Sequence, residues 1–431
     1  MSEAFFPPAG GLSGQLRPPG DKSISHRAAL LGAMASEPVT VRGYLHAADT
    51  DGTLAAVQRL GALVEPRGDD VVLRGTGIRD AREPEDPIDV GNAGTLLRLL
   101  PGWLAAQRGH TYVLDGDESI RRRPVRRVLR PLREMGAGVS AVGDRLPPLT
   151  ITGAPLHGVD WQLDVASAQV KSCILLAGLS ADGHTSVTEP TVSRDHTERM
   201  LLAAGVSVAR EGTTARVANI DELALGEVRV PADVSSAAFF IAAGLLVPGS
   251  RLLLRDVGVN WTRTGFVRIV QRMRGIVLGE FEPPDAPLVA DEPVSDLDVA
   301  HGALEGTVVE AGEVPAAIDE LPLVALLGAF AEGETVVRGA QELRVKESDR
   351  IAAVVGGLRA LGADIEATED GFAVRGTRGL RGGVIDAGGD HRMAMLGAVA
   401  GLASREGVTV RGIEAAAVSY PGFVKDLAGL C

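Results

Sequence analysis

The chain repeats one short pattern six times along its 431 residues. In each copy a strand-like run rich in β-branched residues ends in a turn signal, and successive copies lie about 70 residues apart. The copies are Val39–Gly43, Thr111–Gly116, Thr185–Pro190, Leu252–Asp256, Thr335–Gly339 and Val408–Gly412. Such a period marks one supersecondary unit per copy. Six units in one chain predict two domains of three units each.

A second signal stays in phase with the first. An amphipathic helix ends on a small residue and the chain then enters a strand. This occurs at Leu60–Val64, Met135–Val139, Ala204–Val208 and Leu361–Ile365, with a weaker fifth copy at Arg274–Val277. Short β-rich stretches fill the middle of the units, at Asp70–Gly75 and Gly371–Gly376. The unit therefore reads strand, helix, strand, strand, helix, which predicts an α/β protein.

Two proline-containing junctions predict where the domains separate. Arg17–Gly20 lies near the start of the chain and Val228–Asp233 near its midpoint, and both are stiff, turn-prone segments. The length also exceeds what one hydrophobic core usually supports. We expect an N-terminal three-unit domain at residues 21–230. Residues 1–20 are expected to join residues 231–431 in the second domain, because the last strand unit would otherwise lack its partner.

Composition excludes several classes of function. A formal charge of −13 and a pI near 5.2 disfavour binding to nucleic acid or to an anionic membrane. No apolar run approaches the roughly 18 residues of a membrane helix, so a cytoplasmic location is expected. Cys173 and Cys431 are the only cysteines, and the eight histidines show no paired spacing. We therefore predict no disulfide, no metal and no cofactor.

The segment Gly20–Arg27 predicts an anion cradle. A Pro-Pro-Gly-Asp turn leads into an apolar-periodic helix, which places Lys22 and Ser23 at a helix N-terminus, where backbone N–H groups and the helix dipole favour anions. Arg27 lies one turn further on the same face. An ordinary N-cap with solvated basic residues is about as consistent with the spacing alone. The segment is not a Walker A loop, because Asp21 stands where the glycine before the lysine is needed.

Further polar or glycine-rich segments precede apolar helices. They are Gly91–Thr95, the arginine-rich Ile120–Arg127, Ser167–Ser172, Ser193–Arg199, Ala317–Pro322, Arg344–Arg350 and Gly388–Met395. Each one alone is more often a cap, a turn or a set of helix charges than a binding site. Several cationic helix starts in phase with a repeat are unusual, however. They predict an enzyme that binds phosphorylated, carboxylate-bearing small molecules with lysines and arginines.

The ordered motifs resemble those of the enolpyruvyl transferases over nearly the whole chain. The motifs are PGDKSISHR, GNAGT, RRRP, SAQVKS, RDHTERM, NWTRTG, IDELP, RVKESDR and GDHRMAM. The resemblance implies two similar domains, each of three βαβαββ units in an inside-out α/β barrel, with the active site in the interdomain cleft. It is closest to the members that transfer the enolpyruvyl group of phosphoenolpyruvate to the 5-hydroxyl of shikimate 3-phosphate. It also implies no cofactor, and we expect a monomer.

The resemblance implies roles for individual residues. Those implied to bind shikimate 3-phosphate are Lys22, Ser23, Arg27, Ser167, Ala168, Gln169, Ser193, Arg194, Asp319 and Lys346. Those implied to bind phosphoenolpyruvate are Lys22, Gly94, Arg123, Gln169, Arg350 and Arg392. For catalysis we expect Asp319 to act as the base, Glu347 to deliver a proton to carbon, and Lys22 to stabilise the departing phosphate.

Two positions depart from the family pattern. Val418 stands where many members carry a lysine, so Lys425 is expected to replace that contact or the contact is absent, and Glu342 stands where an asparagine is often found. The nearest rival is the sister enzyme that acts on UDP-N-acetylglucosamine, but it carries a loop cysteine and a Lys-Asn pair, whereas Lys22 is followed by Ser23. A non-catalytic relative would have lost Asp319 and Glu347. An RNA-end-modifying relative conflicts with the charge and the scarce aromatics.

Overall fold

A computed structural model describes residues 2–377 and 379–431. The chain divides into two compact units. The N-terminal unit comprises Gly20–Val230 and Asp285–Glu292, and the C-terminal unit comprises Met1–Pro19, Pro231–Pro284 and Pro293–Cys431. This division differs from the boundaries expected from the sequence at Gly20 and at residues 285–292. The chain thus passes from one unit to the other four times, and not only at the two proline junctions.

The N-terminal unit contains three four-stranded sheets in its described residues. Their strand orders are β16-β3-β5-β4, β6-β7-β9-β8 and β11-β13-β15-β14. The helices are α1 (Lys22–Met34), α2 (Ala48–Arg59), α3 (Gly94–Leu104), α4 (Arg126–Glu134), α5 (Ala168–Gly178) and α6 (His196–Ala203), with a 3-10 turn η1 (Ile120–Arg122). The strands are β3 (Val39–Arg42), β4 (Leu63–Arg67), β5 (Asp70–Arg74), β6 (Ile88–Asp89), β7 (Thr111–Asp115), β8 (Gly138–Val142), β9 (Leu146–Thr152), β11 (Asp160–Gln162), β13 (His184–Thr188), β14 (Val208–Glu211), β15 (Thr214–Ala218) and β16 (Glu227–Arg229). A short pair, β10 (Leu156–His157) and β12 (Ala181–Asp182), lies beside them.

The C-terminal unit repeats this plan with the sheets β18-β19-β17-β2, β20-β21-β23-β22 and the three-stranded β1-β25-β24. The helices are α7 (Val234–Leu246), α8 (Gly265–Arg272), α9 (Val314–Ala317), α10 (Leu321–Phe330), α11 (Arg350–Ala360), α12 (His391–Ala403) and α13 (Phe423–Ala428), with 3-10 turns η2 (Gln341–Val345) and η3 (Ile413–Val418). The strands are β1 (Glu3–Phe6), β2 (Ser13–Leu16), β17 (Arg251–Gly258), β18 (Ile276–Leu278), β19 (Val294–Ala300), β20 (Val308–Val309), β21 (Glu334–Val337), β22 (Asp364–Ala367), β23 (Phe372–Arg375), β24 (Gly383–Asp386) and β25 (Val408–Arg411).

The six predicted strand copies are confirmed as β3, β7, β13, β17, β21 and β25. Each of these strands pairs in parallel with the strand at one side and antiparallel with the strand at its other side. The units therefore have the order βαβαββ, as in β6-α3-β7-α4-β8-β9. The first sheet takes β16 from the far end of the unit, and β1 and β2 pair with β25 and β17.

The helix-to-strand turns explain the second sequence signal. Gly61, Gly136, Gly205 and Gly362 all have positive φ angles, between 76° and 105°, which side chains disfavour. In the weaker fifth copy Arg274 takes this position with φ 64°. The same turn is therefore made there without glycine, which accounts for the poorer match in sequence.

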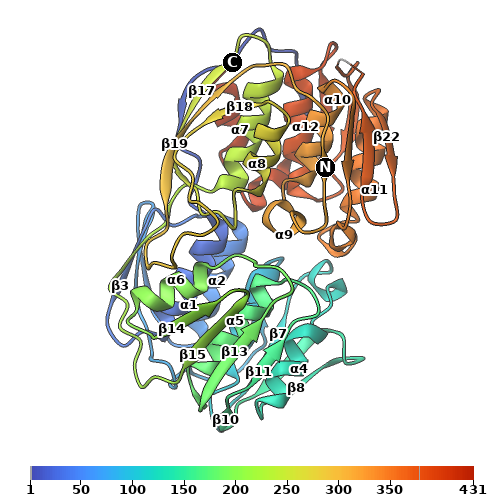
Figure 1. Ribbon diagram of the computed structural model, residues 1–431. Coiled ribbons are helices and arrows are strands. Elements are labelled where there is room, and N and C mark those ends of the chain that lie inside the picture. The colour runs from blue at the N-terminus through green and yellow to red at the C-terminus, as the bar shows by residue number, and fades with distance from the viewer. Residues whose placement is uncertain (1, 378) are drawn as a thin grey trace. The chain divides into compact units, whose positions relative to one another are not determined.

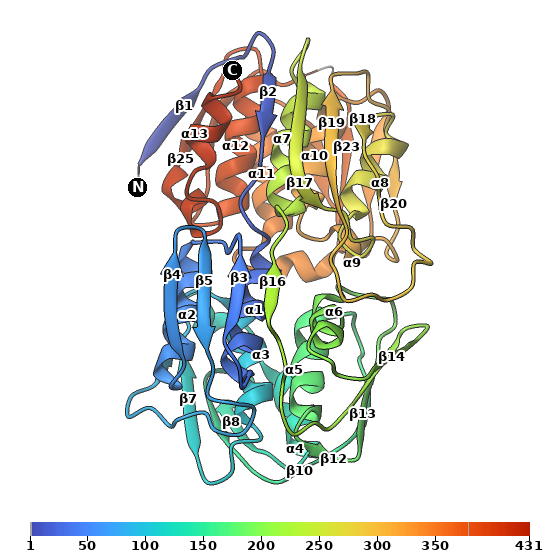
Figure 2. The same ribbon diagram turned by 90° about the vertical axis from the view of Figure 1, so that its left-hand side faces the viewer.

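Some helices form the inside of each unit and strands lie outside them (Figures 1 and 2), whereas other helices, such as α4 and α11, keep one face exposed. The helices α7, α10 and α12 pack against one another in the C-terminal unit, and α3 packs against α1 and α5 in the N-terminal unit. Every residue of α7 is buried. Because an inner helix is covered on all sides, it is apolar all round, and only its ends carry polar groups. Site residues can therefore lie at the helix starts.

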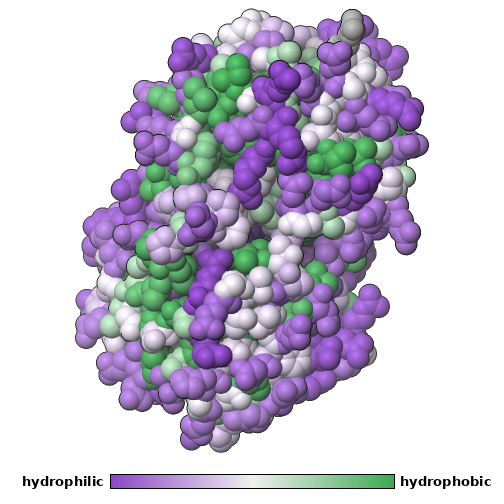
Figure 3. Space-filling model, in the orientation of Figure 1, coloured by the Kyte–Doolittle hydropathy of each residue, from purple (hydrophilic) through white to green (hydrophobic). Residues whose placement is uncertain are grey.

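Among the described residues, no helix is long and apolar enough to cross a bilayer. The face drawn in Figure 3 is mostly hydrophilic, with small separate hydrophobic patches. Leu63 and Leu278 are among the large apolar side chains that are exposed, and scattered residues of this kind are normal on a protein surface.

Candidate active site

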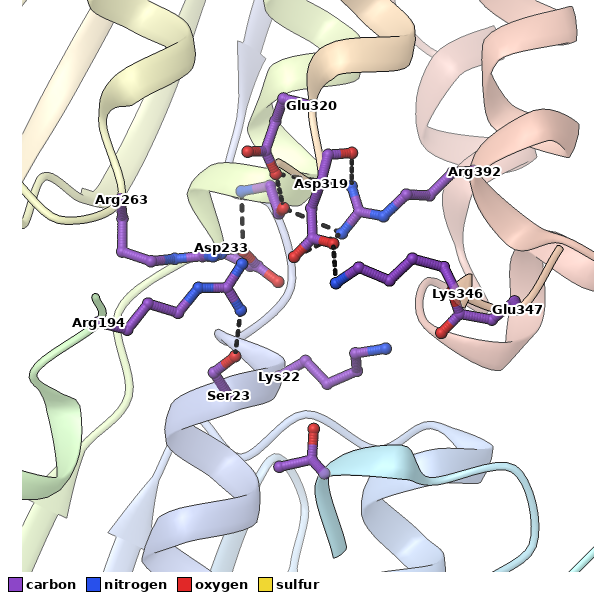
Figure 4. A network of polar contacts seen from close by, with 12 residues as sticks. Lys22, Ser23, Arg194, Asp233, Arg263, Asp319, Glu320, Lys346, Glu347 and Arg392 are labelled. Atoms are coloured by element: carbon purple, nitrogen blue, oxygen red, sulfur yellow. Dashed lines mark hydrogen bonds and ion pairs between the residues drawn. The ribbon is translucent and has the colours of Figure 1, made fainter. Parts of the chain in front are cut away.

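The start of α1 holds the first predicted site residues of the N-terminal unit. Asp21 caps the helix by accepting a hydrogen bond from Ile24 N at 2.9 Å. Lys22 Nζ lies 3.0 Å from Asp49 Oδ2. Ser23 Oγ accepts a hydrogen bond from Arg194 Nη1 at 3.2 Å (Figure 4). Asp21 therefore caps α1, while Lys22 and Ser23 lie at the start of the helix where an anion could bind. The N-cap interpretation and the cradle interpretation are compatible.

Arg27 is buried and ties three helices together. Its Nε donates to Thr197 Oγ1 at 2.8 Å on α6, and its Nη2 donates to Ser172 Oγ at 3.0 Å on α5. A third bond runs from Nη1 to the Ser23 carbonyl at 3.0 Å. Burial, followed by repulsion from Arg194, lowers the pKa of Arg27 to about 10. Arg27 thus remains a cation at neutral pH, placed beneath Ser23.

The start of α5 is joined to α3 by Gln169. Ser167 caps α5 by accepting from Val170 N at 3.4 Å, and Ala168 is the first helical residue. Gln169 Oε1 accepts from Arg98 Nη1 at 2.9 Å, and Gln169 Nε2 donates to Thr95 Oγ1 at 3.0 Å. The helix starts at Gly94 and Ala168 therefore meet, although 71 residues separate Arg98 from Gln169.

Gly94 leaves room for a guanidinium. A β-carbon at this position would lie 2.8 Å from Arg123 Nη1 and 3.1 Å from Arg98 Nη1. Arg123 is buried, and its Nη2 donates to Asn92 Oδ1 at 2.6 Å and to Ser119 Oγ at 3.2 Å. Arg123 of the arginine-rich segment therefore lies toward the start of α3.

Ser193 is buried in the loop before α6. Its hydroxyl donates to Glu189 Oε1 at 2.5 Å, and its backbone N–H donates to Glu189 Oε2 at 3.2 Å. The next residue, Arg194, is half-buried and reaches Ser23. His196 lies 2.6 Å from Glu292, which belongs to the segment Asp285–Glu292.

In the C-terminal unit, Asp319 lies among three cations. Its carboxylate oxygens are 3.6 Å from Lys346 Nζ, 3.5 Å from Arg350 Nη1 and 3.8 Å from Arg392 Nη2. Figure 4 shows the side chains of Lys346 and Arg392 pointing toward the Asp319 carboxylate. Asp319 is two residues before the start of α10 and is 14% exposed. The Asp319 carboxylate can therefore act as a proton acceptor. The cations beside it can contact an anionic ligand.

Arg350 is the buried centre of this group. Its Nε lies 2.8 Å from Asp390 Oδ2, and its Nη2 lies 2.5 Å from Glu347 Oε2. Burial alone would lower the pKa of Arg350, but Glu347 and Asp390 raise it well above its ordinary value. Burial likewise favours neutral Asp390, yet Arg350 and His391 lower the pKa of Asp390 to about 2. Both groups are therefore charged at neutral pH.

Arg392 connects the starts of α10, α12 and α7. Its backbone N–H donates to the N-cap Asp390 at 2.9 Å. Its guanidinium donates to the Asp319 carbonyl at 2.8 Å and to Ser235 Oγ at 3.1 Å, and lies 3.5 Å from Glu320 Oε1. The backbone bond to Asp319 holds the segment that carries the expected base.

The predicted residues gather in two groups, one in each unit. The N-terminal group has Lys22, Ser23, Arg27, Gly94, Arg123, Ser167, Ala168, Gln169, Ser193 and Arg194, and the C-terminal group has Asp319, Lys346, Glu347, Arg350 and Arg392. Lys425, offered as a substitute for the family lysine, is exposed on α13. The described residues contain no cluster of three or more His, Cys, Asp or Glu side chains able to hold a metal ion.

Sequence reasoning missed the partners of the predicted residues. Asp49 pairs with Lys22, Arg98 bonds Gln169, Glu189 bonds Ser193, and Asp390 pairs with Arg350. Asp390 could have been found, because an Asp directly before an apolar helix predicts an N-cap. Asp49, Arg98 and Glu189 lie outside the helix-start segments that were singled out from the sequence. No local sequence pattern indicates their partners.

The same ordered residues align with a known family. The family of EPSP synthase (3-phosphoshikimate 1-carboxyvinyltransferase) matches residues 7–427. The chain belongs to the EPSP synthase family. A relative from Brevibacillus brevis named 3-phosphoshikimate 1-carboxyvinyltransferase is 47% identical over 413 residues, covering 96% of each chain.

Solved structures extend the family likeness to the fold. An EPSP synthase from Acinetobacter baumannii superposes with a TM-score of 0.86 at 40% identity, covering 99% of this chain and 98% of that one. The enolpyruvyl transferase NikO from Streptomyces tendae has a TM-score of 0.77 at 21% identity and covers 99% and 96%. The second likeness concerns the fold alone. The fold class expected from the sequence is confirmed by both.

Proposed function

We propose that this chain transfers the enolpyruvyl group of phosphoenolpyruvate to the 5-hydroxyl of shikimate 3-phosphate and releases inorganic phosphate. The observation that carries the proposal is the family match over residues 7–427, within which the expected cations and carboxylates all occur. The product of this transfer leads toward chorismate and the aromatic amino acids. We also propose that the enzyme is cytoplasmic and acts as a monomer.

The N-terminal group is assigned to binding. Both substrates carry a phosphate and a carboxylate, so cations at helix starts complement them. Lys22, Ser23 and Arg194 are adjacent at the start of α1 and suit shikimate 3-phosphate, as do Arg27, Ser167, Ala168, Gln169 and Ser193 around them. Arg123, Gly94 and Gln169 suit phosphoenolpyruvate, since Gly94 lets a guanidinium approach the backbone.

The C-terminal group is assigned to proton transfer and to part of the binding. Asp319 takes the proton of the 5-hydroxyl as that oxygen bonds to C2 of phosphoenolpyruvate, while Glu347 gives a proton to the methylene carbon. Lys346 lies 3.6 Å from Asp319 and suits the shikimate hydroxyl region. Arg350 and Arg392 suit the anionic groups of phosphoenolpyruvate.

The second half of the reaction reverses the proton transfer at carbon. The bond from C2 to the phosphate oxygen breaks, Glu347 takes a proton back from the methyl group, and the double bond forms again. Asp319 returns its proton to the leaving phosphate, whose charge Lys22 stabilises. Every bond and proton in this scheme balances without an oxidant or a reductant.

Phosphate release tests the proposal directly. Purified protein is given phosphoenolpyruvate together with shikimate 3-phosphate or, separately, with UDP-N-acetylglucosamine. We expect phosphate release only with shikimate 3-phosphate. Release only with UDP-N-acetylglucosamine would assign the sister activity instead, and release with neither from folded protein would leave a non-catalytic member of the family.

A further inference from the structure

A buried cluster of three charges lies behind the N-terminal group. Lys171 Nζ on α5 is 2.8 Å from Glu189 Oε2 and 2.8 Å from Glu198 Oε1, and each side chain is at most 3% exposed. Burial by itself lowers the pKa of Lys171, but the two glutamates raise it above its ordinary value. Taking three charges out of water costs free energy that a well-packed apolar cluster would not cost. The arrangement therefore calls for a reason beyond packing.

The two glutamates differ in what else they hold. Glu189 Oε1 accepts from Ser167 N at 3.2 Å and from Ser193 Oγ at 2.5 Å, and Glu189 Oε2 accepts from Ser193 N at 3.2 Å. One carboxylate thus joins the residue that caps α5 to the loop that precedes α6. Ser167 is 22 residues from Glu189 along the chain, and Ser193 is 4 residues from it. Glu198 has no bond to either serine among the described contacts.

Ionised glutamate suits this position because it only accepts hydrogen bonds. Four donors meet its two oxygens: two backbone N–H groups, one hydroxyl and the Lys171 ammonium. A glutamine would turn one acceptor into an NH₂ donor, which would then face an N–H or ammonium donor. The positions of both serines consequently depend on the charge of one side chain that lies behind them.

We propose that Glu189 is a positioning residue for the binding of shikimate 3-phosphate: without contacting the substrate, it holds Ser167 and Ser193 in the positions from which they bind it. The inference rests on the proposed function, in which both serines bind this substrate. Lys171 pairs with Glu189 and so joins it to α5. Lys171 Nζ also donates to the Ser193 carbonyl at 3.4 Å.

The variant Glu189→Gln tests this role, with Glu198→Gln as the matched control. Both variants remove one carboxylate charge from the same buried lysine, so both are expected to lower the melting temperature. Only Glu189→Gln is expected to raise KM for shikimate 3-phosphate, by about tenfold or more, with KM for phosphoenolpyruvate and kcat within about threefold. Glu198→Gln is expected to leave all three constants within about threefold of wild type.

A role confined to stability would give the two variants the same kinetic constants, and that outcome overturns the proposal. An unchanged KM for shikimate 3-phosphate in Glu189→Gln overturns it too. If Glu189→Gln does not fold, Glu189→Asp keeps the charge but withdraws it by one methylene, and calorimetric titration with shikimate 3-phosphate is expected to show about tenfold weaker binding. Wild-type protein that never turns over shikimate 3-phosphate would instead reject the proposed function itself.

Discussion

The two groups of site residues differ in what surrounds their arginines. In the N-terminal unit, Arg123 and Arg194 donate hydrogen bonds to neutral amide and hydroxyl oxygens. In the C-terminal unit, Arg350 has three carboxylates within 3.5 Å. A bond to a neutral oxygen orients a guanidinium, whereas a carboxylate both compensates its charge and offers a site for a proton.

This difference indicates a division of work between equivalent parts of a repeated fold. Most residues of both groups lie at or near helix starts, so the backbone plan does not distinguish the groups. The side chains do, because the C-terminal group adds Asp319 and Glu347 to its cations. We therefore expect changes in the N-terminal group mainly to weaken substrate binding, and changes to Asp319 or Glu347 in the C-terminal group mainly to slow the chemical steps.

The largest effect is expected from Asp319→Asn. The amide has nearly the same shape but cannot accept the hydroxyl proton, so kcat should fall by up to about 10⁴-fold. Calorimetric titration should still detect binding of shikimate 3-phosphate, and Asp319→Ala should behave alike. If either variant lost binding and turnover together, Asp319 would belong with the binding residues and the division between the two groups would break.

Arg350→Met should destabilise the protein by about 3–5 kcal/mol, because it leaves buried Asp390 and its neighbours without their cation. Urea unfolding followed by tryptophan fluorescence measures the change. Hydrogen exchange should rise in α11 and α12 and stay at wild-type levels in α1 and α5. Arg251→Met, which removes an exposed ion pair with Asp298, is the control and should shift the midpoint little. Equal exchange in both units would contradict a local role.

His26 in α1 is expected to make the stability of the N-terminal unit depend on pH. Burial, which outweighs the attraction of Asp49, lowers its pKa from 6.5 to about 3. As pH falls below 6.5 the unfolded chain binds a proton that the folded chain does not, so the free energy of unfolding falls until about pH 3. Between pH 6.5 and 5 the loss should be about 2 kcal/mol.

Replacing His26 by Gln removes this titration and can keep the contact with Thr53 Oγ1, which is 2.7 Å from His26 Nδ1. Urea midpoints are therefore measured for the wild type and His26→Gln at several values of pH, and the wild-type midpoint should fall relative to that of the variant as the pH falls. Parallel curves would show that His26 does not titrate on unfolding. Because the variant leaves Lys22 and Ser23 unchanged, it alters the stability of α1 without altering the charges at the start of the helix.

The smallest effect is expected from Arg194→Lys. Lysine keeps the positive charge but loses the planar fork, so a bidentate contact with a phosphate becomes a single one. KM for shikimate 3-phosphate should rise about tenfold while kcat stays within about threefold. Arg210→Lys is a suitable control, since Arg210 pairs with Asp195 and is not among the proposed ligands. A fall in kcat alone would place Arg194 with the catalytic group.

Much of the fold could be predicted from the sequence because the repeat is local. A β-branched run and a glycine with positive φ at a helix end, such as Gly61, are decided within a few residues, so the strand copies and their turns were found. Three of the sheets, however, contain a strand from a distant part of the chain, as when β16 joins β3. Nothing within β16 itself indicates its partner.

The same distinction holds for the site. Helix starts with cations are local signals, so the positions of Lys22, Arg350 and Arg392 at helix starts could be predicted. Their partners depend on which helix ends meet after folding, and Asp49, Arg98 and Glu189 were therefore missed. Arg27 illustrates the limit on roles: its place at the start of α1 was predicted, but its bonds to α5 and α6 join residues 145 and 170 positions away.

Deuterium exchange at the methylene carbon of phosphoenolpyruvate tests the division between the two groups most directly. Addition puts a proton on this carbon and elimination removes one, so wild-type protein with shikimate 3-phosphate in D₂O should incorporate deuterium there, as detected by mass spectrometry. We predict that Glu347→Gln loses this exchange by at least about 10²-fold while it binds shikimate 3-phosphate with wild-type affinity. Exchange at the wild-type rate in Glu347→Gln would contradict the account.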